Sequence, residues 1–255
     1  MKIVVLVKQV PDTEDPRTLD LQTGLLNRAE AEPVVDEINE RALEVALQVK
    51  DGAKDTEIVV LTMGPDGATS ALRKALSMGA DSAVHVLDDA LAGSDAARTA
   101  AVLAAAVKST GFDLLIAGNE STDGRGGVVP AMIAEHLGLP HLTSLNSTEI
   151  SDGSVSGVRA GDSGTLNVHA SLPAVITVTE RSAEARFPNF KGILGAKKKP
   201  LTVITLGELG ITEPAARSTV LSTAERPARE AGKKIVDEGN AGVELAEFLI
   251  AERLV

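Results

Sequence analysis

The sequence predicts an α/β fold: a doubly wound, Rossmann-like parallel sheet whose later part is partly antiparallel, followed by an extended C-terminal arm. Three observations lead to this prediction. Short apolar runs alternate with helical patterns through the first 140 residues, and the links between them are short. The first run, residues 3–8, is almost continuously apolar, which is typical of a parallel strand covered on both faces. After Pro140 the helical patterns give way to consecutive strand-like runs.

In the first half, strands are predicted where apolar runs are bounded by turn signals, at residues 3–8, 58–63, 83–87 and 112–117. Helices are predicted where apolar residues recur every three or four positions, at residues 36–50, 66–78, 94–108 and from 128 onward. Gly79 stands where a C-cap glycine belongs, and Gly111 stops the alanine-rich helix that Ser94 and Asp95 can cap. Right-handed crossovers between such units produce a doubly wound parallel sheet.

The chain after Pro140 is predicted to continue mainly as strands. Residues 143–150 and 155–160 flank the turn Ser151-Asp152-Gly153-Ser154, which indicates an antiparallel hairpin. Further strands are expected at residues 165–171, 174–179 and 201–206. Residues 1–206 are therefore interpreted as one α/β domain.

Residues 207–255 are interpreted as an arm that reaches away from this domain. They are polar and interrupted by prolines until a final amphipathic helix, predicted at residues 241–254. A disordered tail is the alternative for residues 212–239. That alternative does not suit the final helix, because its apolar stripe should be buried against another surface. The stripe consists of Val243, Leu245, Ala246, Leu249 and Ile250.

The composition excludes several classes of function. No cysteine is present, so thiolate catalysis, iron–sulfur clusters and cysteine-based zinc sites are ruled out. The net charge of −11 argues against general nucleic-acid binding, which needs a basic surface. No apolar run reaches the length of about 18 residues that a membrane span needs. The charged first strand does not resemble a signal peptide, so the cytoplasm is the expected compartment.

Aromatic residues make up only 2% of the chain, with neither Trp nor Tyr among them. Binding of single-stranded nucleic acid depends on aromatic stacking, so this function is further disfavoured. A protein that enclosed a flavin ring by itself would also be expected to offer aromatic faces. If a flavin is involved, its ring should lie mostly against another chain.

The segment at residues 114–127 is the most informative part of the sequence. A buried strand runs into a polar, glycine-rich loop, and a helix carrying Val128, Met132, Ile133 and Leu137 follows. This order places free backbone N–H groups and the positive end of a helix dipole at the carboxyl end of a strand, which suits an anionic phosphate. The spacing is neither G-x-G-x-x-G nor a Walker A loop. A tight strand-to-helix turn without a ligand is the alternative.

Six stretches of the chain match one known family in order and spacing. They are residues 3–12, 36–44, 73–81, 117–124, 186–193 and 196–199. On these stretches the chain resembles the beta subunit of electron transfer flavoproteins nearly end to end. The most specific are Ala117-Gly118-Asn119-Glu120-Ser121-Thr122-Asp123-Gly124 and Arg186-Phe187-Pro188-Asn189-Phe190-Lys191-Gly192-Ile193.

The resemblance implies an electron carrier without catalytic residues of its own, with a fold similar to the adenine nucleotide alpha hydrolases. In that family an alpha subunit holds most of the FAD, and the beta subunit, its heterodimer partner, buries an AMP. Electrons come from acyl-CoA and other flavin dehydrogenases, as in fatty acid beta-oxidation, and pass to a quinone oxidoreductase. In electron-bifurcating members a second FAD takes the AMP pocket, and this alternative stays open.

The resemblance also implies a set of nucleotide-binding residues. The first strand's end is expected to flank the adenosine, the start of the first helix to line the adenine, and the glycine-rich segment to wrap the ribose and phosphate. By position these residues are Leu6, Val7, Asp36, Glu37, Ile38, Asn39, Met63, Gly118, Asn119, Glu120, Ser121, Thr122, Asp123, Gly124, Arg125, Gly126, Gly127, Val128 and Val129.

The chain departs from the family pattern after the glycine-rich loop. Some relatives carry Asn-Gln-Thr or Gln-Val there, whereas this chain has Gly127-Val128-Val129. Phosphate contacts are then left to backbone N–H groups, to the hydroxyls of Ser121 and Thr122, and to Arg125. For Arg125 the alternatives are a cation that neutralises a phosphate and an exposed loop arginine.

The acidic residues of this set have structural alternatives as well. Asp123 is not expected to touch a phosphate, because like charges repel. It is expected to contact ribose hydroxyls or to cap the following helix. Asp36 and Glu37 stand at a helix start, where carboxylates offset the helix dipole, so this role competes with ligand contact.

A second candidate site lies at residues 187–199. In the resembling family this region is a recognition loop that inserts an apolar side chain into partner dehydrogenases, and Phe190 aligns with that side chain. The expected partner-binding residues are Phe187, Phe190, Ile193 and Leu194. The alternative is a core helix whose Phe side chains face inward, with Lys197-Lys198-Lys199 as cations at its C-terminus. The loop at residues 11–15 is the candidate for approaching the partner's flavin.

The histidines give no sign of metal or nucleophilic chemistry. His85, His136, His141 and His169 form no metal-like pair, and no G-x-S-x-G motif is present. Two other functions compete with that of an electron carrier. A nucleotide sensor similar to universal stress proteins needs neither the arm nor the Phe190 loop. An ATP-pyrophosphatase-like enzyme needs a Ser-Gly-Gly-x-Asp-Ser loop after the first strand, where Lys8-Gln9-Val10-Pro11-Asp12 stands instead.

Overall fold

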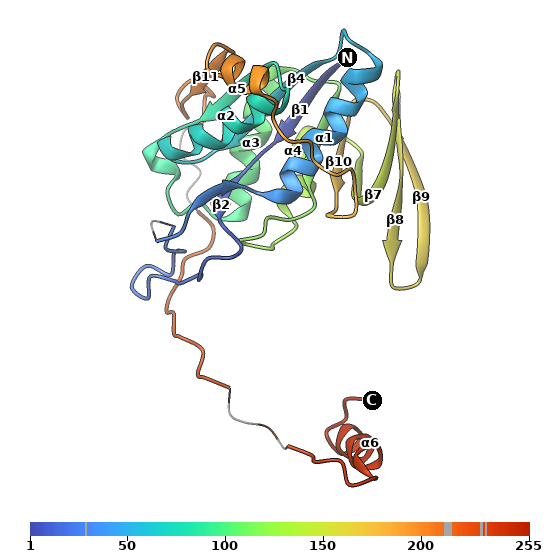
Figure 1. Ribbon diagram of the computed structural model, residues 1–255. Coiled ribbons are helices and arrows are strands. Elements are labelled where there is room, and N and C mark those ends of the chain that lie inside the picture. Colours follow the sequence, from blue (N-terminus) through green and yellow to red (C-terminus); the bar gives the residue numbers. More distant parts are fainter. Residues whose placement is uncertain (29, 212–215, 230–231, 233) are drawn as a thin grey trace.

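The structure is a computed structural model that describes residues 1–255 except 29, 212–215, 230–231 and 233. The strands of its main sheet are β1 (Lys2–Leu6), β4 (Glu57–Met63), β5 (Ser82–Val86), β6 (Leu114–Gly118), β7 (His141–Ser151), β8 (Ser154–Gly161), β9 (Gly164–Ser171), β10 (Ala174–Val178) and β11 (Leu201–Ile204). They form one nine-stranded sheet in the order β11-β5-β4-β1-β6-β10-β7-β8-β9 (Figure 1). The predicted α/β class is confirmed.

The sheet is parallel from β11 to β7 and antiparallel from β7 to β9. The hairpin β7–β8 forms at the predicted turn, and β9 pairs with β8 along its whole length. β10 follows β9 in the chain but lies between β6 and β7, parallel to both. The partly antiparallel later sheet is therefore confirmed.

Helices cover both faces of the parallel part. On one face the sheet packs against α1 (Glu37–Gly52), α2 (Thr69–Met78) and α5 (Phe190–Ala196), and on the other against α3 (Ala96–Thr110) and α4 (Val129–Leu137). The alternation of side chains in β1 shows why this strand is apolar throughout. Ile3 and Val5 belong to the first core, whereas Val4 and Leu6 belong to the second. All four are at most 9% exposed.

The predicted helix ends are largely confirmed. Asp36 caps α1, Asp95 rather than Ser94 caps α3, and Gly111 with φ +69° ends α3. Gly79 ends α2 with φ +145°, a conformation that favours glycine, and a Cβ there would lie 2.6 Å from Leu47 Cδ2. The predicted helix at 66–78 is split into a 3₁₀ turn, Asp66–Ala68, and α2.

The prediction was wrong at the end of the first strand. β1 ends at Leu6, and the chain then enters β2 (Gln9–Pro11), which pairs antiparallel with β3 (Pro33–Val35) in a separate two-stranded sheet. Between them lies an excursion, residues 12–32, of which residue 29 is outside the described part. Among the described residues of the excursion, Leu19 and Leu26 form an isolated antiparallel bridge. Short polar segments of this kind carry no periodicity that would predict them.

The described part of the C-terminal segment, residues 207–255, ends in α6 (Ala241–Ala251), which stops three residues before the predicted end. None of the α6 residues is buried, and Figure 1 shows this helix away from the sheet. Residues 212–215, 230–231 and 233 of the predicted arm lie outside the described residues. Within the described part of the chain, no helix combines the length and the apolar character that crossing a membrane would need.

Candidate functional site

The predicted nucleotide-binding residues meet at one edge of the sheet, where the strand order reverses. From β1 the chain builds outward to β4 and β5 on one side, and then returns to place β6 on the other side of β1. The carboxyl ends of β1 and β6 therefore border the crevice in which doubly wound sheets bind ligands. Leu6 and Val7 lie there at the end of β1, Met63 at the end of β4, and Gly118 at the end of β6.

Asp36 connects the start of α1 with the glycine-rich loop. Its Oδ1 accepts from the amide of Ile38 at 3.0 Å, as expected for an N-cap. Its Oδ2 accepts from the amide of Thr122 at 2.7 Å and from the hydroxyl of Thr122 at 2.9 Å. Asp36 is fully buried and both of its oxygens accept hydrogen bonds, so it has the structural role at the start of α1 that competes with ligand contact. Glu37, by contrast, is exposed in the first turn of α1.

The first turn of α1 also packs closely on the end of β6. The side-chain Oδ1 of Asn39 accepts from the amide of Lys8 at 2.7 Å, which fixes the chain just beyond β1. A Cβ at Gly118 would lie 2.6 Å from Nδ2 of Asn39 and 3.0 Å from Cγ2 of Ile38. Glycine at position 118 is therefore needed for this close approach, although its φ is not positive.

The glycine-rich loop leaves its backbone open to solvent. Residues 124–128 are exposed, and Gly127 has φ +63°. Arg125 has a left-handed φ of +49°, which is uncommon for a residue with a side chain. Its side chain is exposed, and its amide donates to the carbonyl of Ser121 at 2.9 Å. Phosphate contact by Arg125 stays a prediction.

The start of α4 corrects one expectation. Val128 occupies the N-cap position, and no side chain caps the helix there, so Asp123 does not cap α4. The loop between β6 and α4 is longer than a capping turn, and the Asp123 carboxylate forms ion pairs with Lys8 and Arg28 instead of capping the helix. An uncapped helix start leaves backbone N–H groups available to an anion.

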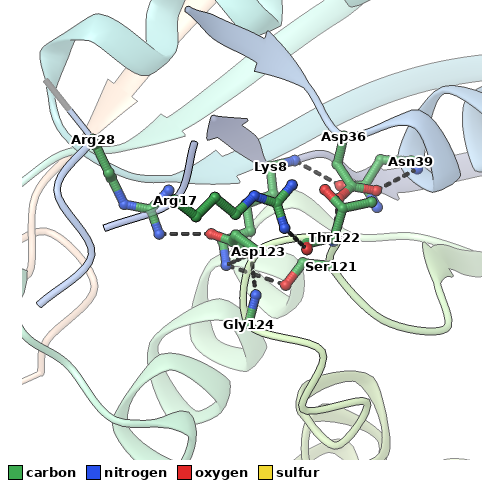
Figure 2. Close-up of polar contacts among 9 residues, drawn as sticks. All are labelled: Lys8, Arg17, Arg28, Asp36, Asn39, Ser121, Thr122, Asp123 and Gly124. Atoms are coloured by element: carbon green, nitrogen blue, oxygen red, sulfur yellow. Dashed lines mark hydrogen bonds and ion pairs between the residues drawn. The ribbon is translucent and has the colours of Figure 1, made fainter. Parts of the chain in front are cut away.

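The Asp123 carboxylate lies between two cations (Figure 2). Lys8 Nζ is 2.8 Å from its Oδ1 and Arg28 Nη2 is 2.6 Å from its Oδ2, while the Asp123 side chain itself is only 1% exposed. Burial raises the pKa of Asp123, but the hydrogen bond and charge of Lys8, together with hydrogen bonds of Ser121 and Arg28, lower this pKa well below its usual range. Arg17 adds a third cation, which donates from Nη1 to the carbonyl of Thr122.

Sequence reasoning did not select these three cations as site residues. Lys8 directly follows the apolar run of β1, so its place at the carboxyl edge could have been expected. Arg17 and Arg28 lie in the excursion, and no local pattern indicated that they reach the glycine-rich loop. Together they place three cations beside Asp123, so the negative charge of its carboxylate is paired within the protein.

The remaining predicted residues line the same edge. Val7 is buried and its amide donates to Leu61, Met63 is half-buried, and Asn119 donates from its amide to Val178. Within the described residues, the Oδ1 of Asn119 is buried without a hydrogen-bond partner. An unsatisfied buried oxygen of this kind is expected where a ligand or water completes the site. Glu120 is half-buried.

The second candidate site, α5 and the residues before it, is exposed. The exposed fractions are 94% for Phe187, 77% for Phe190, 52% for Ile193 and 58% for Leu194. The alternative of a core helix with inward-facing Phe side chains is therefore wrong in this structure. Lys199 does meet helix-end carbonyls, but those near the end of α2: its Nζ donates to Leu76 at 2.9 Å and to Ala80 at 2.5 Å.

Two connections hold this segment on the body of the protein. Arg186, directly before Phe187, pairs with the buried Glu44 through Nε at 2.7 Å and Nη2 at 2.8 Å. The α5 backbone packs against α2 so closely that a Cβ at Gly192 would lie 2.3 Å from the Ser77 carbonyl oxygen. A cavity of about 560 Å³ lies beside α5, away from the glycine-rich loop, and is lined by Arg73, Lys74, Ser77, Ile193, Ala196 and Lys197.

The comparisons with known proteins agree with this geometry. The family model described as electron transfer flavoprotein domain matches residues 23–209. The chain is 51% identical over 99% of both chains to the electron transfer flavoprotein subunit beta of Mycobacterium bovis, and 34% identical over the full length of both chains to that of Bacillus subtilis.

A third relative is the caffeyl-CoA reductase-Etf complex subunit CarD of Acetobacterium woodii, which is 32% identical over 99% of this chain and 97% of the relative. The region that the family model matches includes the glycine-rich loop, α5 and every strand of the main sheet except β1. The chain belongs to the electron transfer flavoprotein family, and within it to the beta subunits.

Proposed function

We propose that this beta subunit binds AMP at the carboxyl ends of β1 and β6 and pairs with an electron transfer flavoprotein alpha subunit that holds most of the FAD. The heterodimer takes electrons from acyl-CoA and other flavin dehydrogenases and passes them to a quinone oxidoreductase. The observation that carries this proposal is the glycine-rich loop at the switch point between β1 and β6.

The residues of this edge suit an adenosine phosphate. Exposed backbone at residues 126–128, beside the start of α4 that no side chain caps, offers N–H groups to a phosphate. Lys8 and Arg28 both pair with the carboxylate of Asp123, so this carboxylate repels a phosphate less than an unpaired one would, in a chain with a net charge of −11. The buried Oδ1 of Asn119 can accept a hydrogen bond from a ribose hydroxyl or an adenine amino group.

Among the described residues, no Phe side chain lies at this edge to stack on a flavin ring. The four Phe residues of the chain are Phe112, before β6, Phe187 and Phe190, at α5, and Phe248, in α6. Bound FAD supplies the redox chemistry, and this chain contributes one wall of its site, for which residues 11–15 are the candidate. For electron transfer this subunit then has to position the FAD, and it needs no acid–base groups of its own.

Docking of dehydrogenases is assigned to Phe187, Phe190, Ile193 and Leu194. These side chains form an exposed apolar surface on a short segment that Arg186 and Gly192 fix to the body. An exposed apolar group with an aromatic centre is typical of a binding hot spot. Residues 207–255 are proposed to bind the alpha subunit. The reason is that no residue of α6 is buried in the described structure, so its apolar side chains need a partner surface.

The experiment that tests this function is mass spectrometry of the nucleotides released from the purified heterodimer, produced by co-expression of both subunits. We expect one AMP and one FAD per heterodimer. Two FAD and no AMP would instead support the bifurcating-type alternative, which the missing side-chain donors at Gly127-Val128-Val129 keep open. A heterodimer without any adenine nucleotide beyond one FAD would contradict nucleotide binding by this chain.

A further inference from the structure

The excursion, residues 12–32, touches two parts of the chain that are far apart in sequence. On one side it reaches the glycine-rich loop, and on the other it meets the C-terminal segment. Its own interior is small: Leu19, Leu21 and Leu25 are each about half exposed. A segment with so little buried apolar surface takes its position from its neighbours.

Its contacts with the glycine-rich loop are ionic and polar (Figure 2). Arg28 Nη2 lies 2.6 Å from Oδ2 of the buried Asp123. Arg17 donates from Nη1 to the carbonyl oxygen of Thr122, across 105 positions of sequence. The two guanidinium groups therefore hold adjacent residues of the loop, one through a side chain and one through the backbone.

Its contacts with the C-terminal segment lie at the opposite end of the excursion. The hydroxyl of Thr223 donates to the carbonyl of Leu21 at 2.8 Å. Gly24 lies against Val220 so closely that a Cβ at position 24 would be 2.7 Å from Cγ1 of Val220. The tip of the excursion is thus in direct contact with residues 220–223.

The C-terminal segment is in turn fixed to the body by Asp95. The Oδ1 of Asp95 caps α3 through the amide of Arg98 at 2.8 Å. Its Oδ2 accepts from the amides of Arg217 at 2.6 Å and Ser218 at 3.0 Å. One carboxylate therefore serves α3 with one oxygen and the C-terminal segment with the other.

We propose that the excursion is a relay in which residues 217–223 set its position, and Arg17 and Arg28 act as positioning residues of the glycine-rich loop. The contacts form one continuous path from Asp95 through residues 217–223 and the excursion to Asp123. The relay would regulate the proposed nucleotide site, so its test by AMP binding rests on the proposed function.

The relay has a chemical consequence for the ligand. Arg28 neutralises a carboxylate that lies in the phosphate-binding loop. When the excursion moves away, Lys8 is the one charged partner left to Asp123 among the described residues, and the negative charge of Asp123 is less compensated. A phosphate nearby is then repelled more strongly, so displacement of residues 217–223 weakens nucleotide binding at a distance.

The test breaks the C-terminal contacts without touching the loop. Asp95→Asn keeps an oxygen that can cap α3, since Asn is as good an N-cap as Asp, but replaces the acceptor that holds residues 217 and 218. Thr223→Val removes one hydroxyl at nearly constant shape. Thr219→Val is the matched control, because it makes the same change at an exposed position four residues earlier. AMP binding to the full-length heterodimer is measured for each variant.

We expect Asp95→Asn combined with Thr223→Val to raise the AMP dissociation constant by about fivefold, at the lower end of common coupling strengths, and Thr219→Val to leave it unchanged. In an Arg17→Gln, Arg28→Gln background the same pair should add little, because both contacts of the excursion with the glycine-rich loop are then already lost. Unchanged affinity in the double variant, or full additivity with the Arg17→Gln, Arg28→Gln pair, would overturn the relay.

Hydrogen exchange of residues 119–127 gives a readout that does not depend on the ligand. Faster exchange in the Asp95→Asn, Thr223→Val variant, but not in Thr219→Val, supports the relay even in a heterodimer that binds no AMP, where nucleotide binding alone would have failed. Unchanged exchange in that loop overturns the relay whatever the nucleotide result.

Discussion

Asp36 and Thr122, 86 positions apart, are joined by two hydrogen bonds, because one carboxylate oxygen accepts from both the amide and the hydroxyl of Thr122. The other oxygen of Asp36 caps α1. A single buried side chain therefore fixes the distance between the start of α1 and the glycine-rich loop. These two elements are the walls of the proposed nucleotide site.

Asp36→Asn should loosen this connection. The amide side chain has one carbonyl oxygen, which can cap α1 or accept from Thr122 but cannot do both. We expect the free energy of unfolding to fall by about 1–3 kcal/mol, the usual penalty for leaving a buried polar group unpaired. Urea denaturation of the heterodimer measures this loss. Glu37→Gln, one residue along on the exposed side of α1, is the control and should change little.

Gly118→Ala should disturb the same site by packing alone. The added methyl group would overlap with Asn39 Nδ2, so the Asn39 side chain, whose Oδ1 holds the amide of Lys8, has to shift. Overpacking of this kind costs about 1–3 kcal/mol, and we expect AMP to be lost in step with it. Gly126→Ala is the matched variant, because position 126 has open space around a Cβ. Equal nucleotide content in both variants would contradict the assigned role of Gly118.

Phe190→Ala tests docking separately from nucleotide binding. The side chain is 77% exposed, so its removal should not lower stability, and the AMP and FAD contents should persist. The KM for electron transfer from an acyl-CoA dehydrogenase should rise about tenfold or more, as for a hot-spot residue. Leu166→Ala removes an apolar side chain that is 55% exposed on β9, away from both proposed sites, and serves as the control. Unchanged transfer kinetics would remove the docking role.

Arg186→Ala should weaken docking by a different route. The change leaves the buried carboxylate of Glu44 without its bidentate partner and frees the start of the docking segment. We expect a loss of about 1–3 kcal/mol in unfolding free energy, less than for a fully buried pair because the Arg186 side chain is 34% exposed. Arg181→Ala, in an exposed pair with Glu180, should cost less than about 0.5 kcal/mol.

Because of His141, the free energy of unfolding should decrease as the pH falls. Burial lowers the pKa of His141, and the positive charge of Arg159 lowers it further. The unfolded chain therefore takes up a proton as the pH falls through about 6.5, while folded His141 still resists protonation. Stability is retained above this range and declines from pH 7.5 to pH 5.5. Denaturation at these pH values should show a smaller decline for His141→Gln, and an equal decline would exclude His141 as its source.

The local elements were predictable because their signals are local. The apolar run of β4, the capping carboxylate of Asp95 and the terminating Gly79 each act within a few residues of chain. The placement of β10 between β6 and β7 was not predictable, because strand order depends on pairing between distant segments. Apolar periodicity reports that a strand is half or fully buried, but not beside which strand it lies.

The candidate site shows the same division. The glycine-rich loop and the capping position of Asp36 could be identified in the sequence, since a strand, a loop and a helix follow one another there. The ion pair between Arg28 and Asp123 joins residues 95 positions apart, and nothing near Arg28 distinguishes it from an ordinary surface arginine. The capping role expected for Asp123 failed for this reason, because its partners come from the excursion.

The position of β10 has a consequence for synthesis of the chain on the ribosome. β8 and β9 are made before β10, yet the antiparallel hairpin can join the parallel strands only through it. Until residues 174–178 have emerged, the facing edges of β6 and β7 have no neighbour and are open to pairing with other nascent chains. The interval between completion of β9 and arrival of β10 is therefore when a growing polypeptide most needs a chaperone.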